Sequence, residues 1–383
     1  MVFYANLRFQ TIIIVSALFL VTSAVNLQAP LYAKYADLSG YGNGMIAVVF
    51  AAYVVGVLPI LVVFGGISER IGRKNSIFLA LVIAMLATSL MILVPKIQTL
   101  IVTRILQGVA FGLCAGASSA YLSESTGRAS NAARYVAATT SIGFGTGALI
   151  TSASLLYTQS LVPSSYWIIT IITLCTTASF VLIPEQKKNQ RTILISAQIP
   201  KGTVLIGLTI TTAWAVSGLT ASILPAQLIS HGIGNWSGVA IFLVMGIGAL
   251  AQPIARKMNP LNSIKVGFAL IPSGFLILLF GSMLGNIVLV LIGASIAGLA
   301  CYGFTYLGGL ALFAKAGGEH NARAISGYYI FTYVGFSIPS IITGFIADTV
   351  GIFTALIYFG LGIVLANVLL FILLQLQITK KVY

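Results

Sequence analysis

The chain has 383 residues, of which 58% are hydrophobic and only 7% are charged. A soluble domain of this length carries roughly a quarter charged residues, so the composition excludes a protein that faces water on all sides. Inside a bilayer every backbone polar group must be paired within a helix or a closed barrel. Stretches that are apolar all round, such as 77–94 and 352–374, are too long for barrel strands and predict membrane-spanning helices.

Windows of helix length predict an all-α integral membrane protein with twelve transmembrane helices. The first span begins near Thr11 and has no small-residue cleavage site, so we expect it to stay in the mature protein instead of acting as a cleaved signal. In chain order the predicted spans are 10–33, 44–66, 76–95, 98–123, 131–157, 165–184, 203–229, 236–255, 264–284, 286–313, 322–346 and 351–378.

The basic residues fall on alternate sides of these spans. Seventeen of the twenty lie in one set of loops and ends, Lys34 and Lys96 lie in the other set, and Arg104 lies inside the fourth span. Because Lys and Arg in short loops stay on the cytoplasmic side, we expect a multi-pass protein of the cell membrane with both termini in the cytoplasm. This topology and contact with anionic membrane lipids account for the net charge of +14, so no nucleic-acid partner is expected.

The most polar linker covers residues 185–202 and divides the predicted helices six and six. We therefore predict an N-terminal half at residues 1–184 and a C-terminal half at residues 203–383, joined by a cytoplasmic linker. A weak repeat agrees with this division, because residues 67–77 match residues 254–264 at four positions without a gap. Repeated halves are typical of transporters and predict two pseudo-symmetric six-helix bundles.

Polar and aromatic residues within the spans predict a central substrate cavity, because polar groups in hydrocarbon are costly unless they meet a partner or water. Arg104 carries the most weight, since a guanidinium inside a span is usually functional; the alternative is that it reaches the outer headgroups. For the others, bonding or packing between helices stays an alternative. The candidate cavity residues are Asn26, Gln28, Tyr32, Arg104, Gln107, Trp214, Gln227, Tyr302, Tyr328 and Tyr333.

The loop after the second span reads Gly65-Gly-Ile-Ser-Glu69-Arg70-Ile-Gly72-Arg73-Lys74. It resembles the signature of the major facilitator superfamily, Gly-x-x-x-Asp-Arg/Lys-x-Gly-Arg-Arg/Lys, with Glu69 where Asp is usual. The resemblance implies an inner gate in which the Glu69 carboxylate meets the start of the eleventh helix, near Arg323. The gating residues that it implies are Gly65, Glu69, Arg70, Gly72, Arg73 and Lys74, with Glu124 as the acidic partner of Arg73.

Two further motifs carry the same resemblance. Arg104-Ile-Leu-Gln107-Gly108 is similar to the Arg-x-x-Gln-Gly pattern in the fourth helix of the family. The run Gly143-Phe-Gly145-Thr-Gly147 partly matches a motif of proton-driven exporters but lacks its proline, so close helix packing is an equal interpretation. Export is favoured by the general style of the sequence, which includes Gln28-Ala-Pro30 and looks like bacterial efflux members.

The resemblance implies a monomeric transporter that moves a small organic molecule by alternating access, with no cofactor and no metal. We expect export by exchange for protons, and the candidates for proton coupling are Asp37, Arg104 and Glu124, with Lys34 beside Asp37. Import, passage without a coupling ion, and export of a metal-chelating metabolite are open alternatives. An intramembrane serine enzyme is disfavoured, because the serines of the loose Gly-x-Ser patterns, Ser118 and Ser295, have no histidine within any span to act as base.

Overall fold

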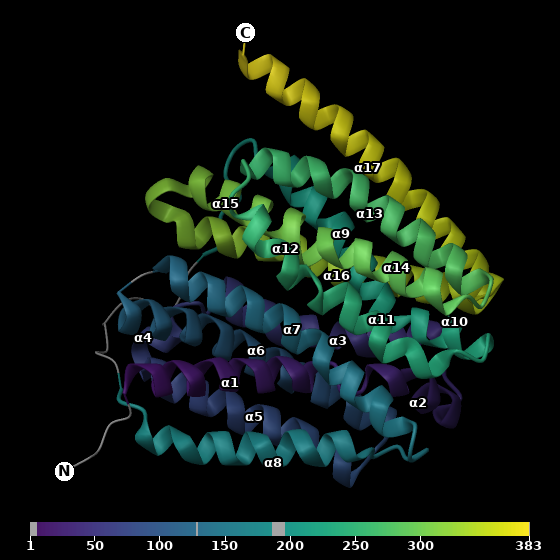
Figure 1. Ribbon diagram of the computed structural model, residues 1–383, viewed down its shortest axis with the longest axis horizontal. Coiled ribbons are helices and arrows are strands. Elements are labelled where there is room, and N and C mark those ends of the chain that lie inside the picture. The colour runs from purple at the N-terminus through teal and green to yellow at the C-terminus, as the bar shows by residue number, and fades with distance from the viewer. Residues whose placement is uncertain (1–5, 128, 186–195, 383) are drawn as a thin grey trace.

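The computed structural model describes residues 6–127, 129–185 and 196–382, and all regular secondary structure in these ranges is helical. Figure 1 shows the long helices running side by side in two stacked groups. The N-terminal helices α1 to α8 form the lower group, and the C-terminal helices α9 to α17 form the upper group. The start of α1 and α4 lie at one end of the molecule, and α2 and α10 lie at the other.

The lower group begins with a first span in three pieces and ends at the last helix before the linker. Its elements are α1 (Leu7–Val25), η1 (Ala29–Leu31), α2 (Tyr32–Ser39), α3 (Asn43–Val62), α4 (Ile67–Ile71), α5 (Arg73–Leu93), α6 (Ile97–Thr126), α7 (Ala129–Leu155), α8 (Ser164–Ser179) and η2 (Phe180–Leu182).

The upper group follows the linker and ends with the longest helix, α17. Its elements are α9 (Val204–Ser222), α10 (Leu224–Ser230), η3 (Gly234–Trp236), α11 (Ser237–Gly246), α12 (Gly248–Ala255), α13 (Pro260–Met283), α14 (Ile287–Gly298), η4 (Leu299–Thr305), α15 (Tyr306–Gly317), η5 (Gly318–His320), α16 (Asn321–Val350) and α17 (Ile352–Val382).

The described residues contain ten segments that are long and apolar enough to cross a membrane. One of them, Ile287–Val350, is 64 residues long and holds two spans, because the chain turns at η5 and α16 packs back against α15. The glycine-rich α7 is not among the ten, but its 27 residues are long enough to cross a bilayer and it lies alongside α1 and α11. Twelve spans therefore result, as the hydropathy pattern predicts.

The first predicted span, residues 10–33, is present as Leu7–Ser39, but it is not one continuous helix. α1 ends at Val25, residues 26–28 form a turn, and the helix resumes as η1 and α2. Pro30 explains the break, because its ring lacks an N–H and would clash with the carbonyl of Asn26 in a continuous helix. The span also extends to Ser39, so Lys34 and Asp37 lie on α2 and not in a loop.

Three other predicted spans are also interrupted. Residues 203–229 divide into α9 and α10 just before Pro225, and residues 236–255 divide at Ile247. In the tenth span the seven residues of η4 form a π-helix between α14 and α15. Such π segments are rare and often lie at functional sites. Here η4 carries Tyr302, which faces the interior between the two groups.

Helix α7 packs tightly through its glycines against α1 of its own group and against α11 of the upper group. A Cβ atom at Gly147 would collide with the carbonyl oxygen of Ser23 on α1. A Cβ at Gly145 would lie 2.7 Å from the Cα of Phe242 on α11. Small residues allow membrane helices to approach closely, so this run has a packing role, which was one of the two interpretations of the motif.

Candidate functional site

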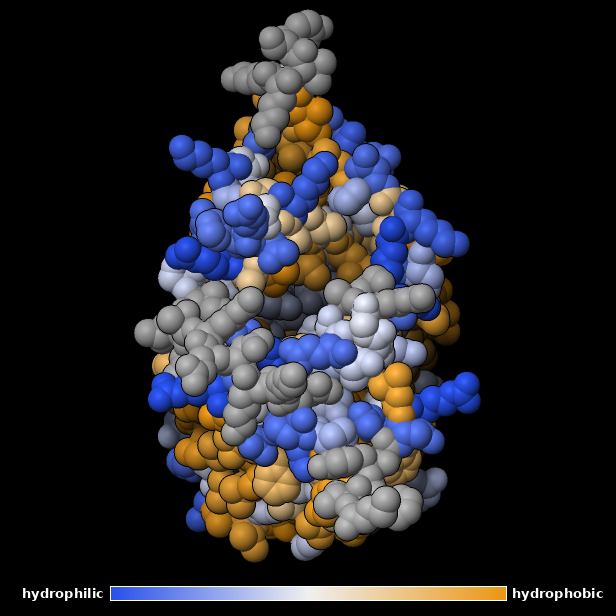
Figure 2. All heavy atoms as spheres, turned by 90° about the vertical axis from the view of Figure 1, so that its left-hand side faces the viewer, coloured by the Kyte–Doolittle hydropathy of each residue, from blue (hydrophilic) through white to orange (hydrophobic). Residues whose placement is uncertain are grey.

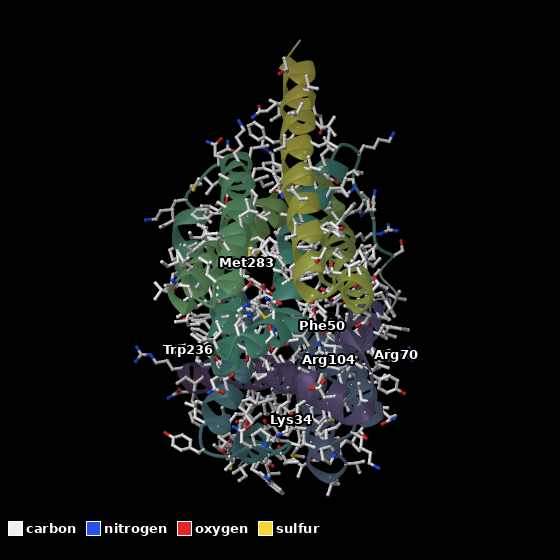
Figure 3. The ribbon with its side chains drawn as sticks, turned by 90° about the vertical axis from the view of Figure 1, so that its right-hand side faces the viewer. Lys34, Phe50, Arg70, Arg104, Trp236 and Met283 are labelled. Carbon is white, nitrogen blue, oxygen red and sulfur yellow. The ribbon has the colours of Figure 1, made fainter. Side chains whose placement is uncertain are left out.

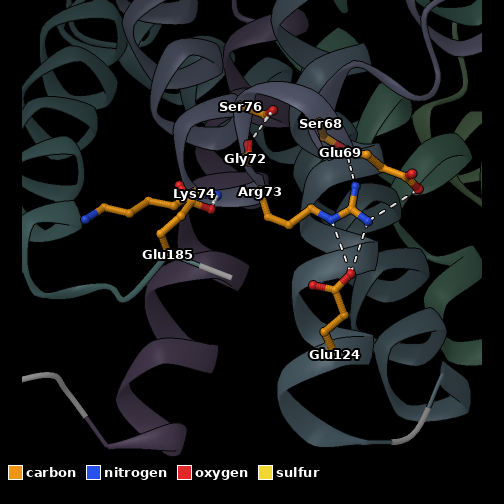
Figure 4. Close-up of polar contacts among 8 residues, drawn as sticks. All are labelled: Ser68, Glu69, Gly72, Arg73, Lys74, Ser76, Glu124 and Glu185. Carbon is orange, nitrogen blue, oxygen red and sulfur yellow. Dashed lines mark hydrogen bonds and ion pairs between the residues drawn. The ribbon is translucent and has the colours of Figure 1, made fainter. Parts of the chain in front are cut away.

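Arg73 is the centre of a charged cluster at the end of the molecule that carries α4 (Figure 4). Its guanidinium lies 3.1 Å from Glu124 at the end of α6 and 3.5 Å from Glu69, and it donates a 2.7 Å hydrogen bond to the Ser68 hydroxyl. The residue is only 8% exposed, so the two carboxylates supply the charge that a nearly buried guanidinium needs. The structure thus joins Glu69, Arg73 and Glu124 of the predicted gate.

The turn between α4 and α5 depends on Gly72, whose φ of 102° is a conformation that other residues rarely adopt. The Glu185 carboxylate lies against this turn and accepts a 3.3 Å hydrogen bond from the Lys74 amide, in the first turn of α5 (Figure 4). A carboxylate at a helix N-terminus satisfies a free amide and meets the positive end of the helix dipole. No sequence pattern connects Glu185 to a residue 111 positions earlier, so this contact could not be predicted.

The predicted contact between Glu69 and the start of α16 is absent from the described residues. Glu69 Oε1 faces Arg73, and Glu69 Oε2 is buried without a hydrogen-bond partner. Arg323, in the first turn of α16, instead donates a 2.7 Å hydrogen bond to Ser196 at the end of the linker. Gly65, Arg70 and the side chain of Lys74 are exposed or half-buried and belong to no ion pair in the described parts of the chain. Lys187, Lys188 and Arg191 of the linker lie outside the described residues.

Arg104 is fully buried beside the break in the first span. Its guanidinium donates hydrogen bonds to the carbonyls of Val25, at the end of α1, and of Phe50, on α3, the latter at 3.0 Å. The same group lies 5.2 Å from the Phe50 ring and 5.0 Å from the Tyr53 ring, which are cation–π distances. Figure 3 shows Arg104 inside the bundle next to Phe50. Extension to the outer headgroups is therefore wrong for this residue.

The broken helix end creates a polar cluster around Arg104, because the last carbonyls of a helix have no partner within it. Gln107 donates to the Ala24 carbonyl at 2.7 Å and to Gln28 at 3.3 Å, and Asn26 donates to the Phe144 carbonyl on α7 at 2.8 Å. Several buried polar atoms of this cluster have no hydrogen-bond partner: Asn26 Oδ1, Gln28 Nε2, Tyr32 Oη, Arg104 Nε and Gln107 Oε1.

A separate aromatic cavity of about 40 Å³ lies between the two groups. The Trp214 ring lies 5.1 Å from that of Tyr302 and 5.5 Å from that of Tyr333, and its indole N–H has no hydrogen-bond partner. This volume holds a few water molecules and no drug-sized molecule. The residues that line it are Leu61, Phe111, Ala115, Val136, Ala137, Thr140, Phe144, Trp214, Gln252, Tyr302, Tyr306, Tyr329 and Tyr333.

Of the predicted cavity residues, Trp214, Tyr302 and Tyr333 line this cavity, and five others form the polar cluster around Arg104. Tyr328 is instead buried against α15, where it donates to the Tyr306 carbonyl at 3.0 Å, and Gln227 lies on α10 near His231. Five other residues that line this cavity are not among the predicted candidates: Phe111, Phe144, Gln252, Tyr306 and Tyr329. Gln252 could have been predicted, because it is an amide side chain in an apolar span. The aromatic residues could not, because the sequence does not distinguish them from the other aromatic residues of these helices.

The candidates for proton coupling lie apart. Asp37 is exposed on α2, and Lys34 donates a 2.6 Å hydrogen bond to the Gln159 carbonyl and forms no ion pair with Asp37 in the described structure. Glu124 belongs to the Arg73 cluster at the opposite end. The two serines of the enzyme alternative bond locally, Ser118 with Cys114 and Ser295 with the Leu291 carbonyl, and neither contacts a histidine among the described residues.

The end of the molecule that carries α4 is the one rich in hydrophilic side chains. Figure 2 looks at this end and shows a hollow near its middle, with hydrophilic side chains below it and hydrophobic ones above it. At the opposite end, the two groups are joined where the Asp348 carboxylate, on α16, accepts a hydrogen bond from the amide of Asn43 at the start of α3. The two ends therefore differ, with a hollow at one and a contact between the two helix groups at the other.

Comparison with known proteins agrees with this architecture. The family model described as Major Facilitator Superfamily matches residues 14–338. The crystal structure of the nucleoside transporter NupG is similar with a TM-score of 0.74 at 15% identity, covering 96% of this chain and 99% of that one. The inward-facing, unoccupied structure of a bacterial homologue of the human lysosomal transporter Spinster has a TM-score of 0.74 at 11% identity, covering 96% of each chain. No curated protein matches the sequence.

Proposed function

The chain belongs to the Major Facilitator Superfamily, and we propose that this alternating-access transporter exports a small amphiphilic organic molecule in exchange for protons. The observation that carries the proposal is the aromatic cavity between the two helix groups. Trp214 stands there between Tyr302 and Tyr333, with an unpartnered indole N–H. Such a site suits a ring-bearing substrate that also accepts a hydrogen bond.

The charge distribution favours a neutral or anionic substrate. All six acidic residues lie within the described ranges, and none lines the aromatic cavity. A buried ammonium group needs a carboxylate partner, so the cavity is unsuited to strongly cationic drugs. Arg104 is the buried charge nearest the break in the first span, and Nε of its guanidinium is unpartnered. We assign to it, with Asp37 and Glu124, the proton-coupling role.

The proposed motion is a rocking of two halves, residues 1–184 and 203–383, about the cavity, with residues 185–202 as a cytoplasmic linker. The Arg73 cluster and the basic loops would then face the cytoplasm, as would both termini, and the protein would act as a monomer in the cell membrane. The contact of Asp348 with Asn43 would close the outer side. Because 40 Å³ is too small for such a substrate, the cavity must widen when one end opens.

The test uses protein reconstituted in liposomes that contain a pH-sensitive dye, under an imposed proton gradient. Amphiphilic drugs, organic acids, amino acids, sugars, nucleosides and metal chelators are added one at a time. We expect proton movement that depends on a ring-bearing neutral or anionic compound and is lost in Trp214→Ala, while Lys96→Gln, at the far end of the fourth span, behaves like the wild type. Substrate movement without proton movement would refute the antiport proposal.

A second candidate is uptake of a nucleoside-like molecule. The similar structure NupG is named as a nucleoside transporter, although at 15% identity the likeness shows only the fold. The specific observation in its favour is the stacked pair of the Trp214 and Tyr306 rings in the aromatic cavity, together with the unpartnered Trp214 indole N–H, which could donate a hydrogen bond to the edge of a nucleobase. Accumulation of a labelled nucleoside in the same liposomes, driven by an inward proton gradient, would favour this candidate over export.

A further inference from the structure

A second, larger hollow lies between α7 and α12 and shares one lining residue, Gln252, with the aromatic cavity. It has a volume of about 680 Å³ and is lined by ten residues: Asn131, Arg134, Tyr135, Ala138, Thr139, Ala249, Gln252, Pro253, Arg256 and Lys257. We call it the α7–α12 groove. It is large enough for a drug-sized ligand or a lipid headgroup.

On the α7 side the groove faces away from the aromatic cavity. On α7, Ala137 and Thr140 line the aromatic cavity, whereas Tyr135, Ala138 and Thr139 line the groove. At 100° per residue these two sets lie on opposite sides of the helix. The groove therefore faces the surroundings of the bundle, which for a transmembrane helix pair means lipid. Large apolar side chains beside it, including Leu250 and Ile254, are 72% and 59% exposed.

Three cations surround this groove without a counter-charge. Arg134 near the start of α7 and Arg256 with Lys257 just after α12 line it, and none of its ten described residues is acidic. Arg256 donates a 3.3 Å hydrogen bond to the Ala133 carbonyl, so the two cationic helix ends are held together despite their like charges. Burial and the neighbouring Arg134 both lower the pKa of Arg256, as expected for a cation that lacks an anionic partner.

From this geometry we infer that the α7–α12 groove binds the phosphate headgroup of an anionic phospholipid from the adjacent leaflet. Arg134, Arg256 and Lys257 would contact the phosphate, and the acyl chains would lie along the exposed apolar face of α12. Basic pockets between transmembrane helices at the cytoplasmic side are suited to such headgroups. Because α7 and α12 belong to different helix groups, the lipid would link the two groups at this end and favour the state in which these helix ends are close.

The test is native mass spectrometry of the full chain in detergent, titrated with phosphatidylglycerol or with phosphatidylcholine. We expect the wild type to retain one phosphatidylglycerol and to bind phosphatidylcholine weakly. In Arg134→Gln/Arg256→Gln the affinity for phosphatidylglycerol should fall about thirtyfold, because each of the two lost charges lowers the affinity about fivefold. The matched control Lys201→Gln/Lys315→Gln removes two charges outside the groove and should bind like the wild type, as should the charge-preserving Arg134→Lys/Arg256→Lys.

Equal retention of phosphatidylglycerol by the Gln variant and the control would overturn the site. If the Gln variant does not fold, the wild-type protein still tests the proposal. Equal retention of phosphatidylglycerol and phosphatidylcholine by the wild type would refute an anionic headgroup site. Displacement of phosphatidylglycerol by millimolar inorganic phosphate would identify a soluble phosphate as the ligand instead, and would also refute the proposal. None of these outcomes depends on the transported substrate.

Discussion

The carboxylate of Asp348 caps the first turn of α3 through Asn43, a residue 305 positions earlier in the chain. It accepts hydrogen bonds from the amide of Asn43 at 2.6 Å and from that of Gly44 at 2.9 Å. A negative charge at a helix N-terminus is stabilising, and here the helix and the charge come from different helix groups. The contact can therefore form only while this end of the protein is closed.

We predict that Asp348→Asn loosens this closure by about 1 kcal/mol, which is about fivefold in the ratio of closed to open states. Spin labels at Leu38→Cys and Leu284→Cys, exposed at this end on opposite groups, would report the change as a longer distance between them in pulsed electron resonance. Exposed Cys175 would be replaced by Ala in all samples. The neighbouring Thr349→Ala serves as control, and an unchanged distance in Asp348→Asn would contradict the role.

Arg104→Lys should lower the transport rate at least about tenfold while the protein still reaches the membrane. A lysine ammonium lacks the planar fork with which Arg104 bonds the Val25 and Phe50 carbonyls together, and an unpaired buried carbonyl costs about 1–3 kcal/mol. The measurement is liposome transport together with thermal unfolding in detergent, with Lys96→Arg as the control. Wild-type transport by Arg104→Lys would show that charge alone suffices.

The Arg73–Glu124 pair should show a coupling free energy of about 1 kcal/mol in a double-mutant cycle. Arg73 is nearly buried, but the Glu124 side chain is 37% exposed, so solvent screening keeps the value near that of a surface pair. The free energy of unfolding would be measured for Arg73→Gln, Glu124→Gln and the double variant. In a parallel cycle of Glu124 with the exposed Arg70, the effects of the two substitutions on the free energy of unfolding should add. Equal coupling free energies in both cycles would contradict a specific pairing of Arg73 with Glu124.

Gly147→Ala should destabilise the protein by about 1–3 kcal/mol, because the added methyl group collides with the Ser23 carbonyl of α1. The matched control is Gly116→Ala on α6, where nothing lies within 4 Å of an added Cβ. That control should be neutral or stabilising by up to about 1 kcal/mol, since Ala favours helix more than Gly does. Thermal unfolding of both variants in one detergent tests the difference, and equal midpoints would argue against tight packing of α7.

The sequence alone determined the class of the protein, the twelve spans and the family. Hydropathy is a local property that adds up along about 20 residues, so a window reveals a span wherever its partners lie. The motif that begins at Gly65 is equally local, because its turn needs a glycine at Gly72 and its charges lie within one loop. These features can be recognised without knowing any contact between helices.

Only the tertiary structure decided which polar residues meet. The break at Asn26 frees carbonyls that Arg104 and Gln107 then bond, while Glu185 caps α5 and Asp348 caps α3. Each of these contacts joins residues 79 or more positions apart, and each depends on how the helices pack. The hydropathy of a segment does not depend on how its helix packs against others. Tyr302 lines the aromatic cavity and Tyr328 is buried against α15, yet both have the same hydropathy.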